Sequence, residues 1–454
     1  MDRGDRETLP PTGLGTAVGQ RSQASVPLVP AVHTPYCGDY DQFSLSSRIR
    51  FPRPRTPLLR AVAPEGQRDP GRPHHREEDT PLRLTVDQAT LLPALGTVAR
   101  AVPSRPVRPI LSSLLLTART GSLTLTATDL ETAAMTSVPA SVEEEGTVAL
   151  PARYLQEAVR RIPAGPIALS SLTAGAGARI LWEKSQSTIH GFAPEEFPPV
   201  PTFPDTPERA MPQGLLRRAI LHSAFAAAQN DSARALLTGV ELRFHNDALF
   251  ALATDGFQVA AYATQPTLER PAESGLVVPA SVLLEIARTL ADSQDSCEIA
   301  RLGNRLLFRS GPTSLVTRTL EGRYFAVLDM VPKDFPTAVQ VERDALSGAC
   351  ERVSLISDNE APYPITLSVS PTTIRVAARS TDVGEAQEEL SAETTGPDIT
   401  VGFNGRQLLQ GLRHFEGRVL RLELSGPSTL ARMTDREDHR LQYMQMPLQM
   451  EGGQ

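Results

Sequence analysis

Three carboxylates stand at matching places in the sequence and are the residues that most suggest chemistry. Asp129, Asp255 and Asp382 each follow a Thr, and the three Thr-Asp pairs begin at residues 128, 254 and 381. Because carboxylates can act as general acids and bases, a hydrolase that uses Asp129 and Asp255 is one hypothesis. A turn Asp that accepts hydrogen bonds from its own backbone explains the same residues without a reaction. The sequence places no nucleophile, phosphate loop or set of metal ligands beside them, so we expect no catalytic residues, no metal and no cofactor.

The elements around these carboxylates repeat along the chain. Residues 123–128 and 249–254 alternate apolar and polar side chains as a half-buried strand does, and residues 374–380 are a less similar third copy. A second marker, in which a short strand leads into a helical pattern, recurs at residues 151, 279 and 403. The steps are 126 and 127 residues for the first marker, and 128 and 124 for the second. Two unrelated markers with one spacing predict three tandem copies of one domain.

Each copy is predicted to hold two amphipathic helices and several strands, which makes the fold class α+β. Asp87 and Asn404 are suited to begin helices, because their side chains can accept hydrogen bonds from the first turn. The helix that follows residue 151 is expected to bury Tyr154, Leu155 and Val159 and to leave arginines outside. Proline-rich connectors at residues 197–204 and 331–336 separate the copies. We therefore expect domains at residues 82–204, 205–335 and 336–450.

Length and composition are consistent with a chain of three domains. The 454 residues correspond to roughly three domains, and no apolar run approaches the ~18 residues that cross a membrane. Three scattered cysteines form no disulfide framework, which favours a reducing cytoplasm. Residues 1–81 are rich in Pro, Gly, Ser and Arg without apolar periodicity, so we expect a disordered extension. A start codon placed too early would give the same composition.

The charge pattern limits how such a chain could bind nucleic acid. The net charge is −7, yet the polar faces of the predicted helices carry arginines in every copy. Since neutralisation of phosphates drives binding to nucleic acid, an acidic chain is a poor simple binder. A ring whose helices line the hole, with acidic residues outside, removes this conflict. Solvated arginines on an ordinary surface, in a scaffold that binds only proteins, are the alternative.

A set of short motifs is similar to those of the bacterial sliding clamps, the beta subunits of the DNA polymerase III holoenzyme. The motifs occur in order on the threefold repeat, from about residue 82 to residue 450: Arg105-Pro-Val-Arg-Pro-Ile-Leu111, Leu123-Thr-Leu-Thr-Ala-Thr-Asp-Leu-Glu131, Ala253-Thr-Asp-Gly256, Val401-Gly-Phe-Asn404 and Tyr443-Met-Gln-Met-Pro-Leu448. The resemblance implies the DNA clamp fold and a head-to-tail homodimer that forms a six-domain ring. It also implies a non-catalytic processivity factor that encircles duplex DNA without reading its sequence.

The resemblance further implies three groups of site residues. Contacts to DNA are expected at Arg105, Arg153 and Gln229, and the dimer interface at Ile189, Leu355 and Ile356. A pocket between the second and third domains is expected to bind short peptide motifs of the replicative polymerase, the clamp loader and repair proteins. Its residues are Arg234, Leu237, Thr254, Gly256, Phe257, Gln258, Val259, Met444, Met446, Pro447 and Leu448.

The chain departs from the family pattern at this pocket. Phe257-Gln258 stands where the family usually has His-Arg, and Tyr324-Phe-Ala-Val-Leu-Asp329 replaces a usual Phe-Pro-Asp-Tyr-Arg-Arg segment. Gln449-Met450 replaces the usual terminal Arg-Leu. The pocket is therefore expected to be less basic and more apolar than is usual, which leaves its peptide preference and the roles of Phe325 and Met330 open.

Overall fold

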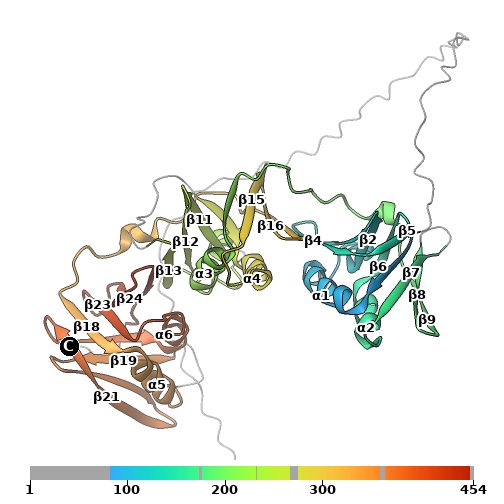
Figure 1. Cartoon of the computed structure of the whole chain (residues 1–454). Coiled ribbons are helices and arrows are strands. Elements are labelled where there is room, and N and C mark those ends of the chain that lie inside the picture. Colours follow the sequence, from blue (N-terminus) through green and yellow to red (C-terminus); the bar gives the residue numbers. More distant parts are fainter. Residues whose placement is uncertain (1–81, 173–175, 232, 266–274, 358–362, 450–454) are drawn as a thin grey trace, which may run out of the picture. The chain divides into compact units, whose positions relative to one another are not determined.

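The structure is a computed structural model that describes residues 82–172, 176–231, 233–265, 275–357 and 363–449. Within these residues one order of elements occurs three times, as repeat 1 (β1 to β9, with β5 as an additional strand), repeat 2 (β10 to β17) and repeat 3 (β18 to β25), shown in Figure 1. No helix in these ranges has the length and apolar character needed to cross a membrane. Residues 1–81, expected to be a disordered extension, lie outside the described part of the chain.

Repeat 1 contains two helices and nine strands. They are β1 (Arg83–Asp87), α1 (Gln88–Val98), β2 (Ser113–Arg119), β3 (Ser122–Thr128), β4 (Thr132–Pro139), β5 (Ser141–Glu144), β6 (Gly146–Pro151), α2 (Ala152–Arg161), β7 (Pro166–Ser171), β8 (Gly177–Trp182) and β9 (Ser185–His190).

Repeat 2 follows the same order without a described counterpart of β5. Its elements are β10 (Arg209–Pro212), α3 (Gln213–Ala224), β11 (Gly239–His245), β12 (Ala248–Thr254), β13 (Gln258–Ala263), β14 (Leu276–Pro279), α4 (Ala280–Thr289), β15 (Ser296–Leu302), β16 (Arg305–Ser310) and β17 (Thr313–Arg318).

Repeat 3 completes the described chain. Its elements are β18 (Thr337–Glu342), α5 (Arg343–Val353), β19 (Pro364–Val369), β20 (Thr373–Ser380), β21 (Gly384–Thr395), β22 (Ile399–Asn404), α6 (Gly405–Leu412), β23 (Val419–Leu424), β24 (Ala431–Asp435) and β25 (Leu441–Gln445). Five short 3-10 helices stand between these elements: Ala99–Ala101, Pro109–Ser112, Pro194–Glu196, Ala235–Thr238 and Val327–Met330.

Antiparallel sheets run across the borders between repeats. One sheet has the order β5-β1-β7-β8-β9 and lies within repeat 1. The second, β10-β15-β16-β17-β4-β3-β2-β6, joins repeat 2 to repeat 1 where β17 pairs with β4. The third, β14-β11-β12-β13-β25-β24-β23-β18-β21-β20-β19-β22, joins repeat 2 to repeat 3 where β13 pairs with β25. Each border is therefore held by backbone hydrogen bonds between two strands.

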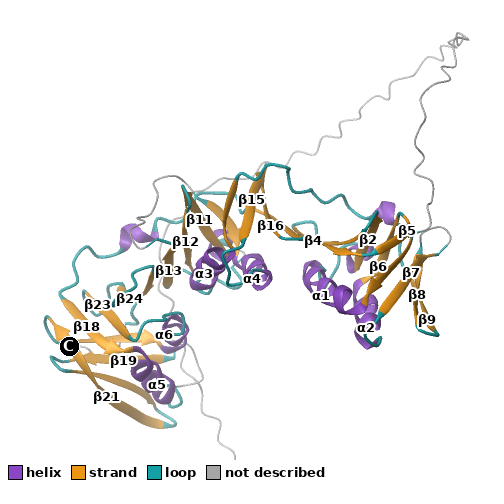
Figure 2. Ribbon diagram, viewed as in Figure 1, coloured by secondary structure: helices purple, strands orange, loops and turns teal. Residues whose placement is uncertain are grey.

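The two helices of each repeat pack together on the strands, as Figure 2 shows for all three pairs. In repeat 2, α3 lies against α4, β12 and β13, and buries Leu216, Ala219 and Ile220. The expected helix starts are confirmed: the Asp87 side chain accepts a hydrogen bond from the backbone N–H of residue 89, and that of Asn404 accepts from residues 406 and 407. These caps satisfy donors that the first helical turn leaves unpaired.

One expected core residue lies on the surface instead. Tyr154 is 66% exposed, whereas Ala152, Leu155 and Val159 of the same helix are buried. The buried stripe follows the spacing i, i+3 and i+7 from residue 152, so residue 154 falls on the opposite face with Arg153. The prediction that Tyr154 belongs to the core was therefore wrong.

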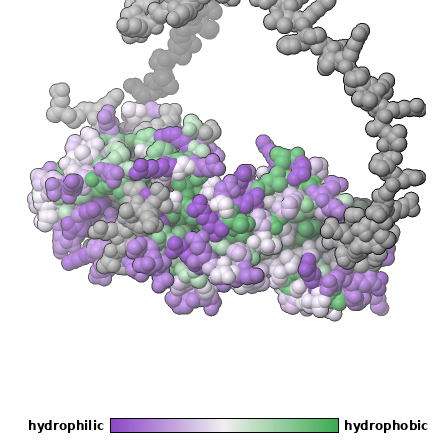
Figure 3. All heavy atoms as spheres, turned by 90° about the horizontal axis from the view of Figure 1, so that it is seen from above, coloured by the Kyte–Doolittle hydropathy of each residue, from purple (hydrophilic) through white to green (hydrophobic). Residues whose placement is uncertain are grey.

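On the surface in view in Figure 3, hydrophobic residues form separate patches among hydrophilic ones.

Candidate functional site

The repeated carboxylates organise turns. One carboxylate oxygen of Asp129 accepts hydrogen bonds from the backbone N–H groups of Glu131 and Thr132, at 2.9 and 2.6 Å. Asp255 does the same for Phe257 and Gln258, at 2.8 and 2.9 Å. The turn interpretation of these two residues is confirmed, because their oxygens are used by the local backbone.

In repeat 3 the matching position is Ser380 rather than Asp382. The Ser380 hydroxyl accepts hydrogen bonds from the N–H groups of residues 382 and 383, two and three residues later, as Asp129 and Asp255 do. Strand pairing agrees, because Ala127, Ala253 and Ala378 oppose Ala134, Ala260 and Ala386 in the three hairpins. Asp382 therefore lies two residues beyond the position of Asp129 and Asp255, and the three carboxylates are not equivalent.

Asp255 also joins repeat 2 to repeat 3. Its second carboxylate oxygen accepts a hydrogen bond from the Gln407 side chain of α6 at 2.9 Å and one from Gln258 at 3.1 Å. The Tyr443 hydroxyl lies 3.0 Å from the Gln258 side-chain oxygen and 2.9 Å from the Gln407 carbonyl. One polar network therefore connects the β12–β13 turn to β25 and α6.

Replacing Asp255 by Ala should cost about 2–3 kcal/mol of unfolding free energy, because it removes hydrogen bonds to a charged group in both repeats. Replacing Asp129 by Ala is the matched control and should cost about 1 kcal/mol, since it removes only the local turn bonds. Urea titration of the two variants measures the difference. Equal losses would mean that the bond between Asp255 and Gln407 contributes little.

The residues expected to form a peptide pocket mostly meet along the pairing of β13 with β25. Val259 lies opposite Met444 in the ladder, and the Met446 N–H donates to the Phe257 carbonyl at 2.8 Å. Gly256 has a φ of +96°, a conformation that favours glycine. This turn therefore brings repeat 2 and the C-terminal segment of repeat 3 to one surface.

Two of the residues expected in the pocket have buried side chains. Gln258 is only 3% exposed and its side chain donates a hydrogen bond to Asp255, so it belongs to the polar network between repeats. Met444 is fully buried and belongs to an apolar cluster with Phe250, Leu252 and Val259. The side chains at positions 258 and 444 therefore both contact the interior of the chain.

The remaining pocket residues occupy different depths. Three of them are buried: Leu237, Thr254 and Pro447. Leu448 is half-buried and forms a backbone bridge to Gly402 of β22, whereas Arg234 is exposed. The Arg234 guanidinium pairs with Asp231 at 2.9 Å and lies close to Gly256. Its charge is therefore already partly neutralised within the chain.

A small apolar cluster, the groove cluster, underlies this surface. It consists of Phe250, Leu252, Val259, Ala261, Ala263, Val277, Tyr324, Leu430 and Met444, with the half-buried residues Leu236, Leu320, Val327, Leu328, Val331 and Met446 packed against it. The sequence analysis placed the segment 324–329 at the pocket but assigned no role to Tyr324, Val327 or Leu328, and it did not name Val331. The Tyr324 hydroxyl fixes the run by donating to the Gly239 carbonyl and accepting from the Thr254 N–H, both at 3.1 Å.

Exposed apolar side chains stand near the groove cluster in the sequence. Phe257 is 64% exposed, Met330 67% and Phe325 38%, on the turn and connector that carry the cluster. Large apolar groups left in water beside an apolar floor are typical of a surface that binds another molecule.

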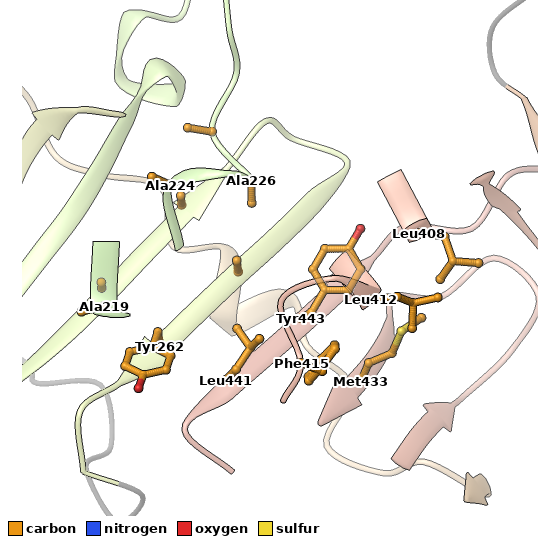
Figure 4. Packing of buried hydrophobic residues seen from close by; sticks show 14 of the residues in the cluster. Ala219, Ala224, Ala226, Tyr262, Leu408, Leu412, Phe415, Met433, Leu441 and Tyr443 are labelled. Carbon is orange, nitrogen blue, oxygen red and sulfur yellow. The ribbon is translucent and has the colours of Figure 1, made fainter. Parts of the chain in front are cut away.

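Below the turn the two repeats share an aromatic core. His222 stacks on Tyr262 with ring centres 5.0 Å apart, and His414 stacks on Phe225 at 3.9 Å. Burial, together with the neighbouring His222, lowers the pKa of His414 to about 4, so this ring is neutral near pH 7. Figure 4 shows Tyr443 beside Leu412 in the same core, with Leu441 and Tyr262 toward repeat 2.

The three residues expected to contact DNA are all exposed. Arg105 lies in the segment between α1 and β2, Arg153 on α2, and Gln229 after α3. Within the described residues neither Arg105 nor Arg153 has a carboxylate within ion-pair distance. Both guanidinium groups are therefore available to phosphates.

Many other helix arginines are paired. Arg288 of α4 pairs with Glu285, Arg352 of α5 with Glu388 at 2.6 Å, and Arg413 beside α6 with Glu351 at 3.3 Å. Such pairs reduce the positive potential of the helix faces. The helix faces are therefore less positively charged than their arginines alone would make them.

The residues expected at a dimer interface differ in exposure. Leu355 is 79% exposed just after α5, Ile356 is half-buried, and Ile189 of β9 is half-buried against the core of repeat 1.

The described residues contain no group of three or more His, Cys, Asp or Glu arranged to hold a metal ion. Burial raises the pKa of the Cys297 and Cys350 thiols to about 12, which keeps both protonated.

Comparison with known proteins agrees with this architecture. Residues 82–201, 210–325 and 329–449 match, in order, the N-terminal, central and C-terminal domains of the DNA polymerase III beta subunit. The beta sliding clamp of Synechococcus elongatus is 30% identical over 383 residues, which cover 81% of this chain and all of the relative. That of Streptomyces coelicolor is 30% identical over 383 residues, covering 82% and 100%.

Solved structures give the same result. A griselimycin-bound sliding clamp from Pseudomonas aeruginosa superposes with a TM-score of 0.75 at 26% identity, covering 81% of this chain and all of the other. The Caulobacter crescentus beta sliding clamp gives 0.76 at 26%, covering 82% and 100%. This chain therefore belongs to the DNA polymerase III beta subunit family, whose relatives are named beta sliding clamps.

Proposed function

We propose that this chain is a sliding clamp: two copies close head to tail into a six-domain ring around duplex DNA. The ring carries no catalytic site and works in the cytoplasm. It tethers the replicative polymerase, the clamp loader and repair proteins to DNA through short peptides that bind at the groove cluster. The domains are residues 82–204, 205–335 and 336–450.

The observation that supports the ring most is the way in which the repeats join. At each internal border, the last strand of one repeat pairs with the third strand after the first helix of the repeat before it. These pairs are β17 with β4 and β25 with β13. Among the described strands, β9 pairs only with β8, and residues 384–391 of β21 pair only with β20. Unpaired edges favour pairing with another chain, and two such borders would close a pair of copies.

The mass in solution tests the ring directly. Light scattering at micromolar concentration should give a particle of twice the chain mass of 49.0 kDa. A stable monomer, or a mass that grows with concentration as open chains would, contradicts the proposal.

The groove cluster should bind a peptide with two apolar anchors, and charge should add little because Arg234 is already paired with Asp231. Truncating the half-buried Met446 to Ala removes apolar contact area and should weaken binding by about 1–2 kcal/mol. Titration of a fluorescent peptide that bears a Gln and two apolar anchors measures this. Met135→Ala, which shortens a half-buried Met of β4, is the matched control and should bind as the unmodified protein does.

Equal affinities of the Met446→Ala variant and the unmodified protein would place the binding site elsewhere. A larger deletion that begins at Tyr443 is unsuitable as a test, because β25 pairs with both β13 and β24 and its loss would open the core.

A further inference from the structure

Repeats 1 and 2 build the turn before each internal border in the same way. Asp129 and Asp255 each use one carboxylate oxygen to accept hydrogen bonds from the backbone of their own turn. The residue that follows each Asp has a positive φ, +83° at Leu130 and +96° at Gly256. Because the two turns share this frame, the surroundings of the second carboxylate oxygen can be compared between the two borders.

At the border between repeats 2 and 3, the second oxygen of Asp255 has two hydrogen-bond donors. They are the side-chain amides of Gln407 at 2.9 Å and Gln258 at 3.1 Å. Two buried side chains lie beside these amides: the Tyr443 hydroxyl is 3.0 Å from the side-chain oxygen of Gln258 and 3.4 Å from that of Gln445. Four long side chains therefore meet at this border.

Shorter side chains stand at the four equivalent positions of the border between repeats 1 and 2. Strand pairing identifies two of these positions, and the distance from the turn and from the start of the second helix identifies the other two. The replacements are Leu315 for Tyr443, Thr317 for Gln445, Thr132 for Gln258 and Val282 for Gln407. In the described part of the chain, no group donates a hydrogen bond to the second oxygen of Asp129.

The shorter side chains leave two cavities at this border, of about 360 and 250 Å³. Asp129, Thr132 and Val282 line both of them. The larger one, the border cavity, is also lined by Arg318 and Glu321. Its volume lies in the range of ~300–1,000 Å³ that is usual for ligand sites, and it stands between two domains, where such sites are frequent.

The charges on the wall of the border cavity favour a cation. Arg318 pairs with Glu131 at 2.9 Å, so its charge is balanced within the chain. Glu321 is exposed and forms no ion pair with another described residue, and Asp129 keeps one oxygen without a donor. A cationic group that carries N–H donors would satisfy both carboxylates, whereas an anion would be repelled by them.

An arginine side chain has the required chemistry. Its guanidinium group is planar and presents five N–H donors in a fork that matches carboxylate oxygens. Gln407 shows that a side chain can reach the equivalent position, since its amide donates to Asp255 across the other border. A guanidinium group in the border cavity would take the place that this amide holds between repeats 2 and 3, with a positive charge added.

We propose that the border cavity binds an arginine side chain of a partner protein, whose guanidinium group donates hydrogen bonds to the second carboxylate oxygen of Asp129. One chain supplies the whole site, so binding requires neither a dimer nor DNA. The site is separate from the groove cluster, which lies at the border between repeats 2 and 3. A partner with an apolar peptide and an arginine-bearing segment therefore has one contact at each internal border.

Titration of the full chain with short blocked peptides tests the chemistry of the site. The probes are an arginine peptide, which is arginine between two glycines with both ends blocked, and the same peptide with citrulline, which keeps the size of arginine without its charge. Calorimetric titration should show the arginine peptide binding at least tenfold more tightly, and its affinity should fall as salt screens the charges. Equal affinities of the two peptides would overturn the proposal. Free arginine that binds as tightly as the arginine peptide would also overturn it, because the occupant would then be a small molecule.

Two variants place the arginine peptide in the border cavity. Asp129→Asn keeps one side-chain oxygen for the turn and replaces the second by an NH₂ group, so the affinity should fall at least tenfold. Val282→Gln supplies the side chain that α6 has at the equivalent position, so it should fill the cavity, raise the melting temperature and exclude the peptide. Asp382→Asn is the matched control, because it removes the same charge from a residue that does not line the cavity, and it should bind as the unmodified protein does.

The outcomes separate this site from the groove cluster. Met446→Ala should weaken only the apolar peptide that binds at the groove cluster and should leave the arginine peptide unaffected. If Asp129→Asn and Val282→Gln bind the arginine peptide as tightly as the unmodified protein does, the peptide binds elsewhere and the proposal is wrong. If the unmodified protein binds no arginine peptide while Val282→Gln still raises the melting temperature, the cavity holds only water, which also contradicts the proposal.

Discussion

Bound to a linear duplex that is anchored at one end, the protein should stay on the DNA when the free end is capped and leave within seconds to minutes when it is not. A ring threaded over the end is held by topology, so a bulky protein cap is enough to retain it. Several helix arginines are already paired with carboxylates in the chain, which leaves little charge for direct phosphate binding. Retention should therefore depend on the cap far more than on affinity.

Salt separates enclosure from simple binding. A protein that holds six to ten phosphates loses roughly 10³–10⁵ in affinity between 50 and 200 mM salt. The enclosed protein should instead remain through this change on capped DNA, and cutting the DNA between the cap and the anchor should release it. Equal loss from capped and uncapped DNA at moderate salt would mean that ordinary arginine–phosphate contacts hold the protein, and the ring would be wrong.

Local pattern accounted for most of the fold. Alternation before Asp129 and Asp255 predicted β3 and β12, and the caps at Asp87 and Asn404 marked helix starts, because each signal depends on residues a few positions apart. The misplacement of the third turn at Asp382 has a simple reason. The turn between Ala378 and Ala386 is one residue longer than those of the other repeats, and Ser380 can replace a carboxylate as the hydrogen-bond acceptor.

The site was harder to predict because its contacts join distant parts of the chain. Gln258 looked like a surface substitution, yet its environment is set by Tyr443 and Gln407, 185 and 149 positions further along. The groove cluster likewise combines strands of repeat 2, the connector at residues 324–331 and the C-terminal strand. Sequence spacing gives no measure of such contacts.

The connection between repeats 2 and 3 should fail when Tyr443 is shortened. The Tyr443 ring is fully buried against Gly411 of α6, where an added Cβ would lie 2.3 Å from the ring. Replacing Tyr443 by Ala leaves a cavity and removes the hydroxyl that lies between Gln258 and Gln407, and should cost about 3–5 kcal/mol of unfolding free energy. Because β13 pairs with β25, hydrogen exchange of the amides in these two strands should accelerate most.

Two matched variants separate the stabilising contribution of the aromatic ring of Tyr443 from that of its hydroxyl. Tyr443→Phe keeps the ring and should cost about 1–2 kcal/mol, the contribution of a buried hydrogen bond. Tyr154→Ala removes the same side chain from the surface of the isolated chain, and its free energy of unfolding should change by less than about 0.5 kcal/mol when measured on the monomer. Urea titration of all three variants decides the matter. If Tyr443→Ala loses no more unfolding free energy than Tyr443→Phe, the aromatic ring contributes nothing to the contact between repeats 2 and 3. Backbone pairing of β13 with β25 must then hold these repeats together.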